Sequence, residues 1–319
     1  MSVPAILSRL RLPVIGSPLF IISGPDLVIA QCKAGIVGSF PALNARPQGL
    51  LDEWLHRITE ELAAHNRDNP DRPAAPFAVN QIVHKSNTRL ERDLEICHRH
   101  KVPIWITSLG ARPEVNHAAH DCGGIALHDI INVTYARKAL EKGADGLIAV
   151  AAGAGGHAGK QNPFALIQEI REFFDGPLLL SGAIATGRAI LAARAAGADL
   201  AYIGSPFIAT VEANAVPGYK QMIVDSGADD IVNSSLFTGI HGNYLKPSIR
   251  NAGMDPDALE SADPSSMDFG KGTAKAKAWS EIWGSGQGIG AVKSVQPAAA
   301  LVDRLAAEYA AARRELCAA

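Results

Sequence analysis

Eight short apolar runs, separated by stretches of helical character, constrain the fold of this chain more than any other feature. Each run has the length of a strand and is bounded by turn residues, as expected for strands buried on both faces of a parallel sheet. Strict alternation with helices predicts such a sheet, and eight strands are enough to close it into a barrel. We therefore predict an α/β fold, a (β/α)8 TIM barrel. The eight runs are residues 12–17, 35–40, 77–80, 102–108, 124–128, 146–151, 177–181 and 201–205.

A short glycine-containing motif recurs at the junctions between helices and strands and favours the same fold. Gly35, Gly143 and Gly197 each stand where a predicted helix ends and the next strand begins. Glycine adopts the left-handed conformation that closes a helix at little cost. The spacing between these motifs is too long and too irregular for a solenoid. We therefore interpret them as the result of a strand–helix unit that recurs along the chain.

The pattern changes after Ser205. We predict a helix near residues 212–225 and an irregular insertion or lid at 226–275 that covers the mouth of the barrel. Apolar residues at helical spacing predict a last helix at 297–314, which we expect on the outside of the barrel. The chain would thus consist of a barrel at 1–215, a lid segment at 216–290 and a terminal helix segment at 291–319.

The composition excludes several classes of partner and site. A formal net charge of -2 over 319 residues gives no electrostatic reason to expect nucleic acid or an anionic membrane. The four cysteines are scattered, so we expect neither structural disulfides nor a zinc site, and we assign no metal ligands. The start of the chain lacks the layout of a secretory signal, and no stretch approaches the roughly 18 apolar residues of a membrane helix. We expect a cytoplasmic protein; a homodimer is compatible with the sequence.

Active sites of such barrels lie at the carboxyl ends of the strands, so the strand ends hold the candidate residues. Ser181-Gly182-Ala183 and Gly204-Ser205 follow the seventh and eighth predicted strands. Barrels often bind a phosphate there, on backbone N–H groups and a helix N-terminus, and serine hydroxyls can add donors. The alternative is that both segments are ordinary turns.

A glycine-rich loop at 153–159 follows the sixth strand and carries His157. Glycines such as Gly156 have no Cβ, so a flat ligand can lie close to the backbone, and an imidazole can act as a base near neutral pH. A histidine among glycines has few neighbours to pack against, which favours a functional role over a core role. His128, at the end of the fifth strand, could contact a cofactor or could cap the next helix.

The same loop and a second glycine cluster need a further interpretation. Residues 153–158 formally match the dinucleotide fingerprint G-x-G-x-x-G/A, but the next strand ends in Ser-Gly rather than in an acidic residue that would hold a ribose. We therefore reject a Rossmann fold. The cluster at 284–290 follows no predicted strand, and two interpretations stay open: a turn before the last helix, or a part of the rim of the site.

Three motifs resemble those of the nitronate monooxygenases, formerly called 2-nitropropane dioxygenases. They are AGGHAG at 154–159, SGAIATGR at 181–188 and GSPFIAT at 204–210. The similarity runs from about residue 12 to 215, with a weaker echo at 237–239 and 286–288. That family shares its fold with FMN-dependent enoyl-ACP reductases and with a group of NADH:quinone reductases.

The resemblance implies an FMN-containing TIM barrel. In it, Ser181, Gly182, Gly204 and Ser205 would hold the phosphate, and Ala183, Gly156 and His128 would also contact the cofactor. The first loop, Ser17, Pro18 and Leu19, would back the flavin ring, with Asn80 near it, and His157 would be the base or the substrate-orienting group. The chain departs from the family in its first loop, in the lid segment, and at Gly153, where many members have glutamate. These departures concern the substrate more than the cofactor.

The reaction implied is the oxidation of an alkyl nitronate, or of a nitroalkane, by FMN and O2 to a carbonyl compound and nitrite. The nearest alternative is an NAD(P)H-dependent FMN reductase acting on a quinone or an enoyl thioester. A flavin-free barrel isomerase or aldolase with a phosphorylated substrate would use the same phosphate site. A flavin-binding module without catalysis is the remaining alternative.

Overall fold

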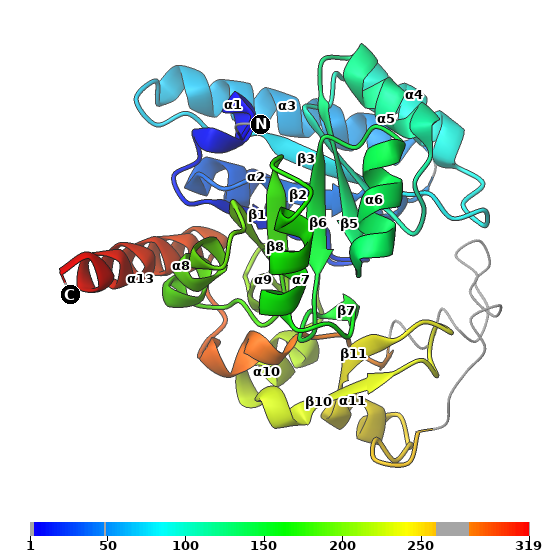
Figure 1. Cartoon of the computed structure of the whole chain (residues 1–319), viewed down its shortest axis with the longest axis vertical. Helices are drawn as coiled ribbons and strands as arrows, with labels where there is room; N and C mark the ends of the chain where they lie inside the picture. Colours follow the sequence, from blue (N-terminus) through cyan, green and yellow to red (C-terminus); the bar gives the residue numbers. More distant parts are fainter. Residues whose placement is uncertain (1–2, 48, 260–280, 319) are drawn as a thin grey trace.

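The computed structural model describes residues 3–47, 49–259 and 281–318, and its main element is a barrel of eight parallel strands (Figure 1). Hydrogen bonds join the strands in the order β1-β9-β8-β6-β5-β4-β3-β2, and a parallel bridge between Ile15 and Val37 brings the first and last of them together. The predicted (β/α)8 barrel is confirmed. The strands are β1 (Val14–Gly16), β2 (Gly38–Pro41), β3 (Phe77–Ile82), β4 (Ile104–Ser108), β5 (Ile125–Ile130), β6 (Gly146–Val150), β8 (Leu178–Ser181) and β9 (Leu200–Ile203).

Helices connect these strands and cover the outside of the barrel. Three of them begin at polar N-caps, Asn132, Asn162 and Thr186, whose side chains accept a backbone N–H of the first turn. The first connecting helix, Pro25–Ala34, ends at Gly35, which adopts the left-handed conformation at φ 95°. The connecting helices are α2 (Pro25–Ala34), α3 (Leu50–Asp68), α4 (Leu90–Arg99), α5 (Pro113–Asp121), α6 (Val133–Glu141), α7 (Pro163–Arg171) and α8 (Gly187–Ala195).

Alternation along each strand decides which side chains enter the barrel. On β4, Ile104 and Ile106 belong to the cluster that fills the interior, whereas Trp105 packs outward among the helices. On β5, Leu127 is an interior residue and Ala126 an exterior one. Successive side chains of a strand point alternately into and out of the barrel. These interior residues therefore determine which later residues of each strand face the cavity at its open end.

A second, antiparallel sheet lies beside the barrel mouth (Figure 1). It has the order β10-β11-β7, from β7 (Gly156–His157), β10 (Ile231–Ser234) and β11 (Gly242–Leu245). The expectation of an irregular segment at 226–275 was therefore wrong for its first part, which also contains α11 (Lys246–Asn251). Residues 260–275 lie outside the described ranges. The strands escaped prediction because each is short, mixes apolar with polar residues and is defined by its partners.

Four short elements complete the region around the mouth. The helix predicted near 212–225 is α10 (Pro217–Asp225), which starts later because proline occupies its first position. The others are α9 (Ser205–Ile208), η2 (Ala228–Asp230) and η4 (Gln287–Ala291), while α1 (Ala5–Ser8) and η1 (Ala42–Asn44) lie near the chain start.

The last helix, α13 (Ala298–Ala318), runs along α8 and α2 (Figure 1). It buries Leu301, Val302 and Leu305 against the barrel's main apolar cluster. Its contact with α8 is unusually close: a Cβ added at Gly187 would come 2.1 Å from the backbone nitrogen of Tyr309. Only glycine permits this approach of the two helices.

Replacing Gly187 by alanine is therefore expected to destabilise the protein, since the obstructing atoms belong to backbone that must move. Overpacking of this kind typically costs about 1–3 kcal/mol, and thermal denaturation should show a lower Tm. Gly227→Ala is a matched control, because a Cβ there would meet nothing within 4 Å. Equal Tm values for the two variants would contradict the close contact.

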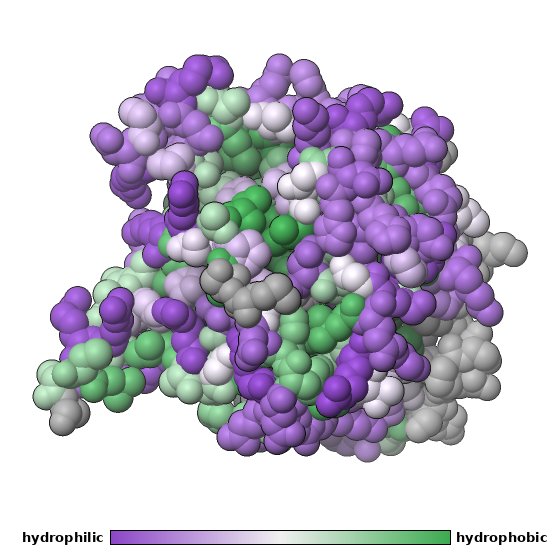
Figure 2. All heavy atoms as spheres, turned by 45° about the horizontal axis from the view of Figure 1, so that its top comes forward, coloured by the Kyte–Doolittle hydropathy of each residue, from purple (hydrophilic) through white to green (hydrophobic). Residues whose placement is uncertain are grey.

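The face seen in Figure 2 is mostly hydrophilic, with smaller hydrophobic areas between polar side chains. One such area lies at the projecting end of α13, where Leu316 is exposed. Within the described ranges, no helix combines the length and the apolar character that crossing a bilayer requires.

Candidate functional site

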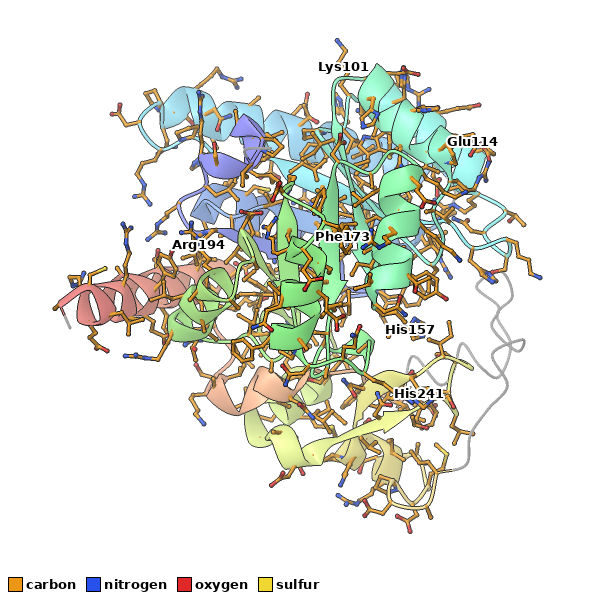
Figure 3. All side chains as sticks on the ribbon, in the orientation of Figure 1. Lys101, Glu114, His157, Phe173, Arg194 and His241 are labelled. Carbon is orange, nitrogen blue, oxygen red and sulfur yellow. The ribbon has the colours of Figure 1, made fainter. Side chains whose placement is uncertain are left out.

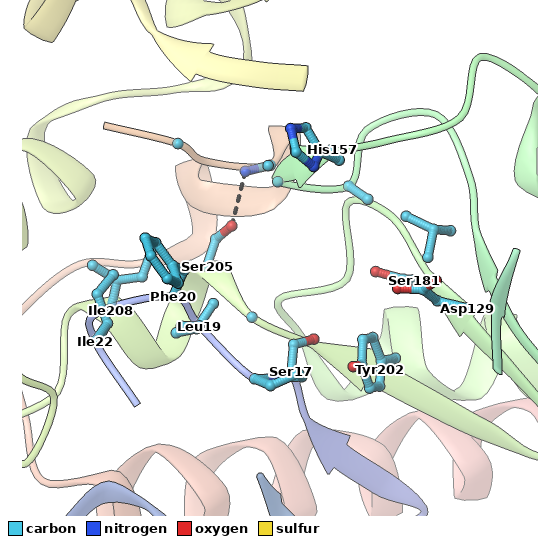
Figure 4. A pocket seen from close by; sticks show the side chains of 18 of the residues that line it. Ser17, Leu19, Phe20, Ile22, Asp129, His157, Ser181, Tyr202, Ser205 and Ile208 are labelled. Atoms are coloured by element: carbon cyan, nitrogen blue, oxygen red, sulfur yellow. Dashed lines mark hydrogen bonds between the residues drawn. The ribbon is translucent and has the colours of Figure 1, made fainter. Parts of the chain in front are cut away.

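A cavity opens at the carboxyl ends of the barrel strands and is partly covered by the segments that follow β9 (Figure 4). Almost every residue that the sequence singled out lines it. These are Ser17, Pro18, Leu19, Asn80, Gly156, His157, Ser181, Gly182, Ala183, Gly204 and Ser205. The two serine-containing turns after β8 and β9 therefore face one space, together with the imidazole.

His128 is the exception. It does not line the cavity; it is buried on the outer face of β5, where its Nδ1 hydrogen-bonds to the Thr107 hydroxyl. Burial lowers the pKa of His128 to about 4. The strand alternation that turns Leu127 inward turns His128 outward and brings Asp129 to the cavity instead.

The turn after β8 is held in an uncommon backbone conformation. Ala183 has a φ of 53°, which a non-glycine residue rarely adopts. Its N–H donates to the carbonyl of Gly153 at 3.1 Å, and the same carbonyl accepts the N–H of Gln287 at 2.9 Å. One carbonyl of the glycine loop thus joins the β8 turn to the start of η4. Such strain tends to persist where surrounding contacts fix a functional site.

The glycine cluster at 284–290 lies at the cavity, in agreement with the second of its two interpretations. Gly284, Gly286 and Gly288 line it. The N–H of Gly286 donates to the Ser205 hydroxyl oxygen at 2.8 Å, the bond drawn in Figure 4. This segment closes one side of the space above the β9 turn.

His157 is positioned by the second sheet. It lies on β7, an edge strand of that sheet, opposite Gly242 of β11 (Figure 3). Its Nε2 is 2.9 Å from the Thr238 hydroxyl, which lies between β10 and β11. Burial lowers the pKa of His157 to about 4, so the imidazole is neutral at physiological pH.

The Thr238 hydroxyl has several polar neighbours. It donates to the carbonyl of Ile240 at 3.0 Å, accepts the N–H of Ile240 at 3.3 Å, and hydrogen-bonds to the Tyr244 phenol as well as to Nε2 of His157. The contact with Thr238 orients the imidazole. A neutral imidazole held in this way is suited to accept a proton.

The floor of the cavity is polar. The Asn80 amide donates to the Ser108 hydroxyl oxygen at 2.7 Å, and Ser108 in turn hydrogen-bonds to the Asp129 carboxyl. Asp129 keeps some contact with the cavity but is otherwise surrounded by protein. Burial raises the pKa of Asp129 to about 6, although the Ser108 hydrogen bond lowers it. The phenol of Tyr202 lies nearby, and burial and then the charge of Asp129 raise its pKa.

The opposite side of the cavity is apolar. Leu19, Phe20, Ile22 and Ile208 form this side, away from Asp129 and Ser181 in Figure 4. Near the mouth, the rings of Tyr219 and Trp283 stack with their centroids 4.8 Å apart.

The charges available at the site are few. No lysine or arginine is among the described residues that line the cavity. The described ranges also contain no cluster of histidine, cysteine or carboxylate residues that could hold a metal ion. A bound anion would therefore rely on hydroxyl and backbone N–H donors.

Four residues of the site were missed or not selected from the sequence: Ser108, Asp129, Tyr202 and Thr238. Ser108 and Asp129 stand at the ends of predicted strands but were not chosen as site residues. Tyr202 stands on a barrel strand and could have been found from the inward phase of that strand. Thr238 falls in the weak family echo at 237–239, but its contact with His157 could not be predicted, because only the fold of the second sheet brings the two together.

Comparison with known proteins places the chain among a defined group. A family model described as nitronate monooxygenase matches residues 5–308. A nitronate monooxygenase of Paraburkholderia phytofirmans is 30% identical over 337 residues, covering 93% of this chain and 92% of that protein. A putative monooxygenase of Mycobacterium tuberculosis is 29% identical over 182 residues, which span 54% of this chain and only 46% of that protein.

Two solved structures share the fold. The nitroalkane oxidase from Streptomyces ansochromogenes has a TM-score of 0.78 at 24% identity, covering 98% of this chain and 100% of that one. The enoyl reductase domain of MlnA from Bacillus amyloliquefaciens has a TM-score of 0.67 at 15% identity, with 97% of each chain covered.

Proposed function

The chain belongs to the nitronate monooxygenase family, and on this basis we propose that it oxidises alkyl nitronates with bound FMN and O2, giving a carbonyl compound and nitrite. Membership makes it a flavin-dependent oxidoreductase. The nitronate as substrate and FMN as the particular flavin are the proposed parts. The observation that supports both proposals is that His157 and the turns after β8 and β9 line the same cavity.

The residues of the cavity fit such a flavin. Hydroxyls of Ser17, Ser181 and Ser205 and the backbone of the glycine turns supply the donors that phosphate oxygens accept. Gly156, at φ 66°, presents bare backbone, and a Cβ added there would meet nothing within 4 Å. In this proposal, Gly182, Ala183 and Gly204 hold the phosphate with those serines, and Pro18, Leu19 and Asn80 lie beside the ring.

When bound, FMN would supply electron transfer from the substrate to O2. The chain's own residues would do the rest. The imidazole of His157 would remove the α-proton of a neutral nitroalkane, or orient a nitronate that has already lost it. Thr238 would orient the imidazole, and the segments over the mouth would limit the entry of water. The barrel at 1–215 would hold the cofactor, and the described part of 216–290 would cover it.

The purified protein tests the proposal directly. We expect a flavin absorbance spectrum and, on addition of an alkyl nitronate in air, release of nitrite and a carbonyl compound with uptake of O2. A colourless protein would refute the flavin. A flavin protein that releases no nitrite from any alkyl nitronate would refute the substrate.

An NAD(P)H-dependent reductase is the second candidate, because the fold is shared with an enoyl reductase domain. Mixing with NADH without oxygen separates the two. Rapid bleaching of the flavin would favour the reductase, whereas an unchanged spectrum together with nitronate turnover favours the monooxygenase.

A further inference from the structure

Ile21 has a backbone conformation that its side chain disfavours. Its φ is 59°, in the left-handed region, where a β-branched residue is an outlier. The side chain lines the cavity and is 45% exposed. An exposed isoleucine alone would need no explanation, but one held in a strained conformation at the mouth of a cavity does.

Two asparagines from other parts of the chain hold Ile21 in place. Its N–H donates to Asn44 Oδ1 at 2.8 Å, and its carbonyl accepts from Asn214 Nδ2 at 3.0 Å. The Asn44 amide also donates to the carbonyls of Leu19 and Ser23, at 2.9 and 2.8 Å. Both backbone groups of Ile21 are thus fixed by side chains, and the whole turn at 19–23 is tied to η1.

The surroundings of Ile21 favour an apolar ligand group. Phe20 and Ile22, its neighbours in sequence, line the same cavity, and Ile22 lies with Leu19 and Ile208 on the apolar side in Figure 4. The described residues that line the cavity include no lysine or arginine that could pair with a charged tail. The guanidinium of Arg46 lies over the Phe20 ring, 5.7 Å from its centroid, and its Nε donates to the carbonyl of Leu43 at 2.9 Å. A hydrocarbon chain would gain by covering the apolar side, while a carboxylate buried there would lose its hydration.

We propose that Ile21 determines substrate specificity: held at the mouth by Asn44 and Asn214, it packs on the hydrocarbon tail of the substrate and selects uncharged alkyl chains over short or carboxylate-ended ones. This inference rests on the proposed function, of which it specifies the substrate class. Ile21 acts on binding of the tail and has no part in the proton transfer at His157.

A series of linear alkyl nitronates from ethyl to octyl, with propionate 3-nitronate as the charged member, tests the proposal. In the flavin-loaded protein, kcat/KM should rise about two- to fourfold per methylene through KM over the first few additions. Propionate 3-nitronate should fall well below the alkyl compound of equal length. Ile21→Gly should flatten the dependence of KM on chain length.

Two further variants serve as controls. Ile21→Asn introduces a polar residue that tolerates the left-handed conformation. This variant should also flatten the dependence of KM on chain length. Val211→Ala removes an exposed apolar side chain that does not line the cavity, and its series should match the wild type. Chain-length dependence that is absent in the wild type, or unchanged in both Ile21 variants, would overturn the proposal.

Binding of linear primary alcohols, measured calorimetrically with the same protein, separates this inference from the function. If nitronates are not oxidised but alcohols bind more tightly with each methylene, and Ile21→Gly abolishes that trend, Ile21 has the proposed role and the reaction is wrong. If nitronates are oxidised and alcohols bind equally well to wild type and variant, the reaction stands and the role of Ile21 is refuted.

Discussion

Replacing His157 by asparagine is expected to lower kcat/KM for a neutral nitroalkane by a factor of about 10² to 10⁴, the usual contribution of a general base. The flavin should stay bound, because the imidazole is not part of the proposed phosphate site. A preformed nitronate should lose less, because it has no α-proton to remove. Nitrite release measures the rates, and the visible absorbance spectrum measures the flavin content.

The pH dependence gives a second signature of the same group. Burial lowers the pKa of His157 to about 4, so the neutral, basic form prevails above that pH. The wild-type kcat/KM for nitroalkane should therefore show no histidine limb near pH 6.5 and should fall only as the pH approaches about 4. A limb near the ordinary value would show that the imidazole is not buried as described.

His241→Asn is the matched control, because His241 lies near His157 (Figure 3) but is exposed and hydrogen-bonds through Nδ1 to Asn233. It should leave the rate unchanged. Thr238→Val keeps the shape of the side chain but removes the hydroxyl that hydrogen-bonds to Nε2 of His157, and about a tenfold loss is expected. Equal losses in the variants at 157 and 241 would contradict the assignment of the base.

Replacing Asp129 by asparagine is expected to stabilise the flavin-free protein at neutral and alkaline pH. The pKa of Asp129 is raised to about 6 from an ordinary 3.8, chiefly by burial. The folded state therefore binds this proton more tightly than the unfolded state does. Stability falls as the pH rises from about 4 to about 6, and the cost, up to about 3 kcal/mol, is present in full above that range. Asparagine avoids it.

Thermal denaturation of the flavin-free protein between pH 4 and 8 measures this effect. The Tm of Asp129→Asn should exceed that of the wild type by about 5 °C at pH 8, and the two should converge toward pH 4. Asp225→Asn removes one carboxylate from an exposed position and serves as the control for net charge. A constant Tm difference at all pH values would mean that Asp129 does not titrate as described.

The barrel could be predicted because its determinants are local. Each strand is an apolar run bounded by turn residues, and glycines such as Gly35 mark the helix ends. The second sheet could not, because β7 has two residues and β10 and β11 are short segments with polar positions. β10 and β11 pair with each other across a short connection, and β11 pairs with β7, where Gly242 lies opposite His157, 85 residues earlier. No local pattern encodes that second pairing.

The site residues also divide into those that local sequence predicts and those that depend on the folded structure. Turns such as Ser181-Gly182-Ala183 were found because strand ends are visible in the sequence. His128 was chosen instead of Asp129 because a strand buried on both faces is apolar throughout. Its hydropathy therefore does not show which residues point into the barrel. Thr238 depends on the second sheet and was inaccessible for that reason.

The sheet that fixes His157 also imposes an order of events during synthesis. Thr238 follows His157 by 81 residues, and Gly286 follows Ser205 by the same number. At translation rates of ~5–20 residues per second, these partners leave the ribosome roughly 4–16 s after the residues that they hold. A nascent chain therefore completes the barrel floor while its upper side is still open, and it acquires its reactive geometry last.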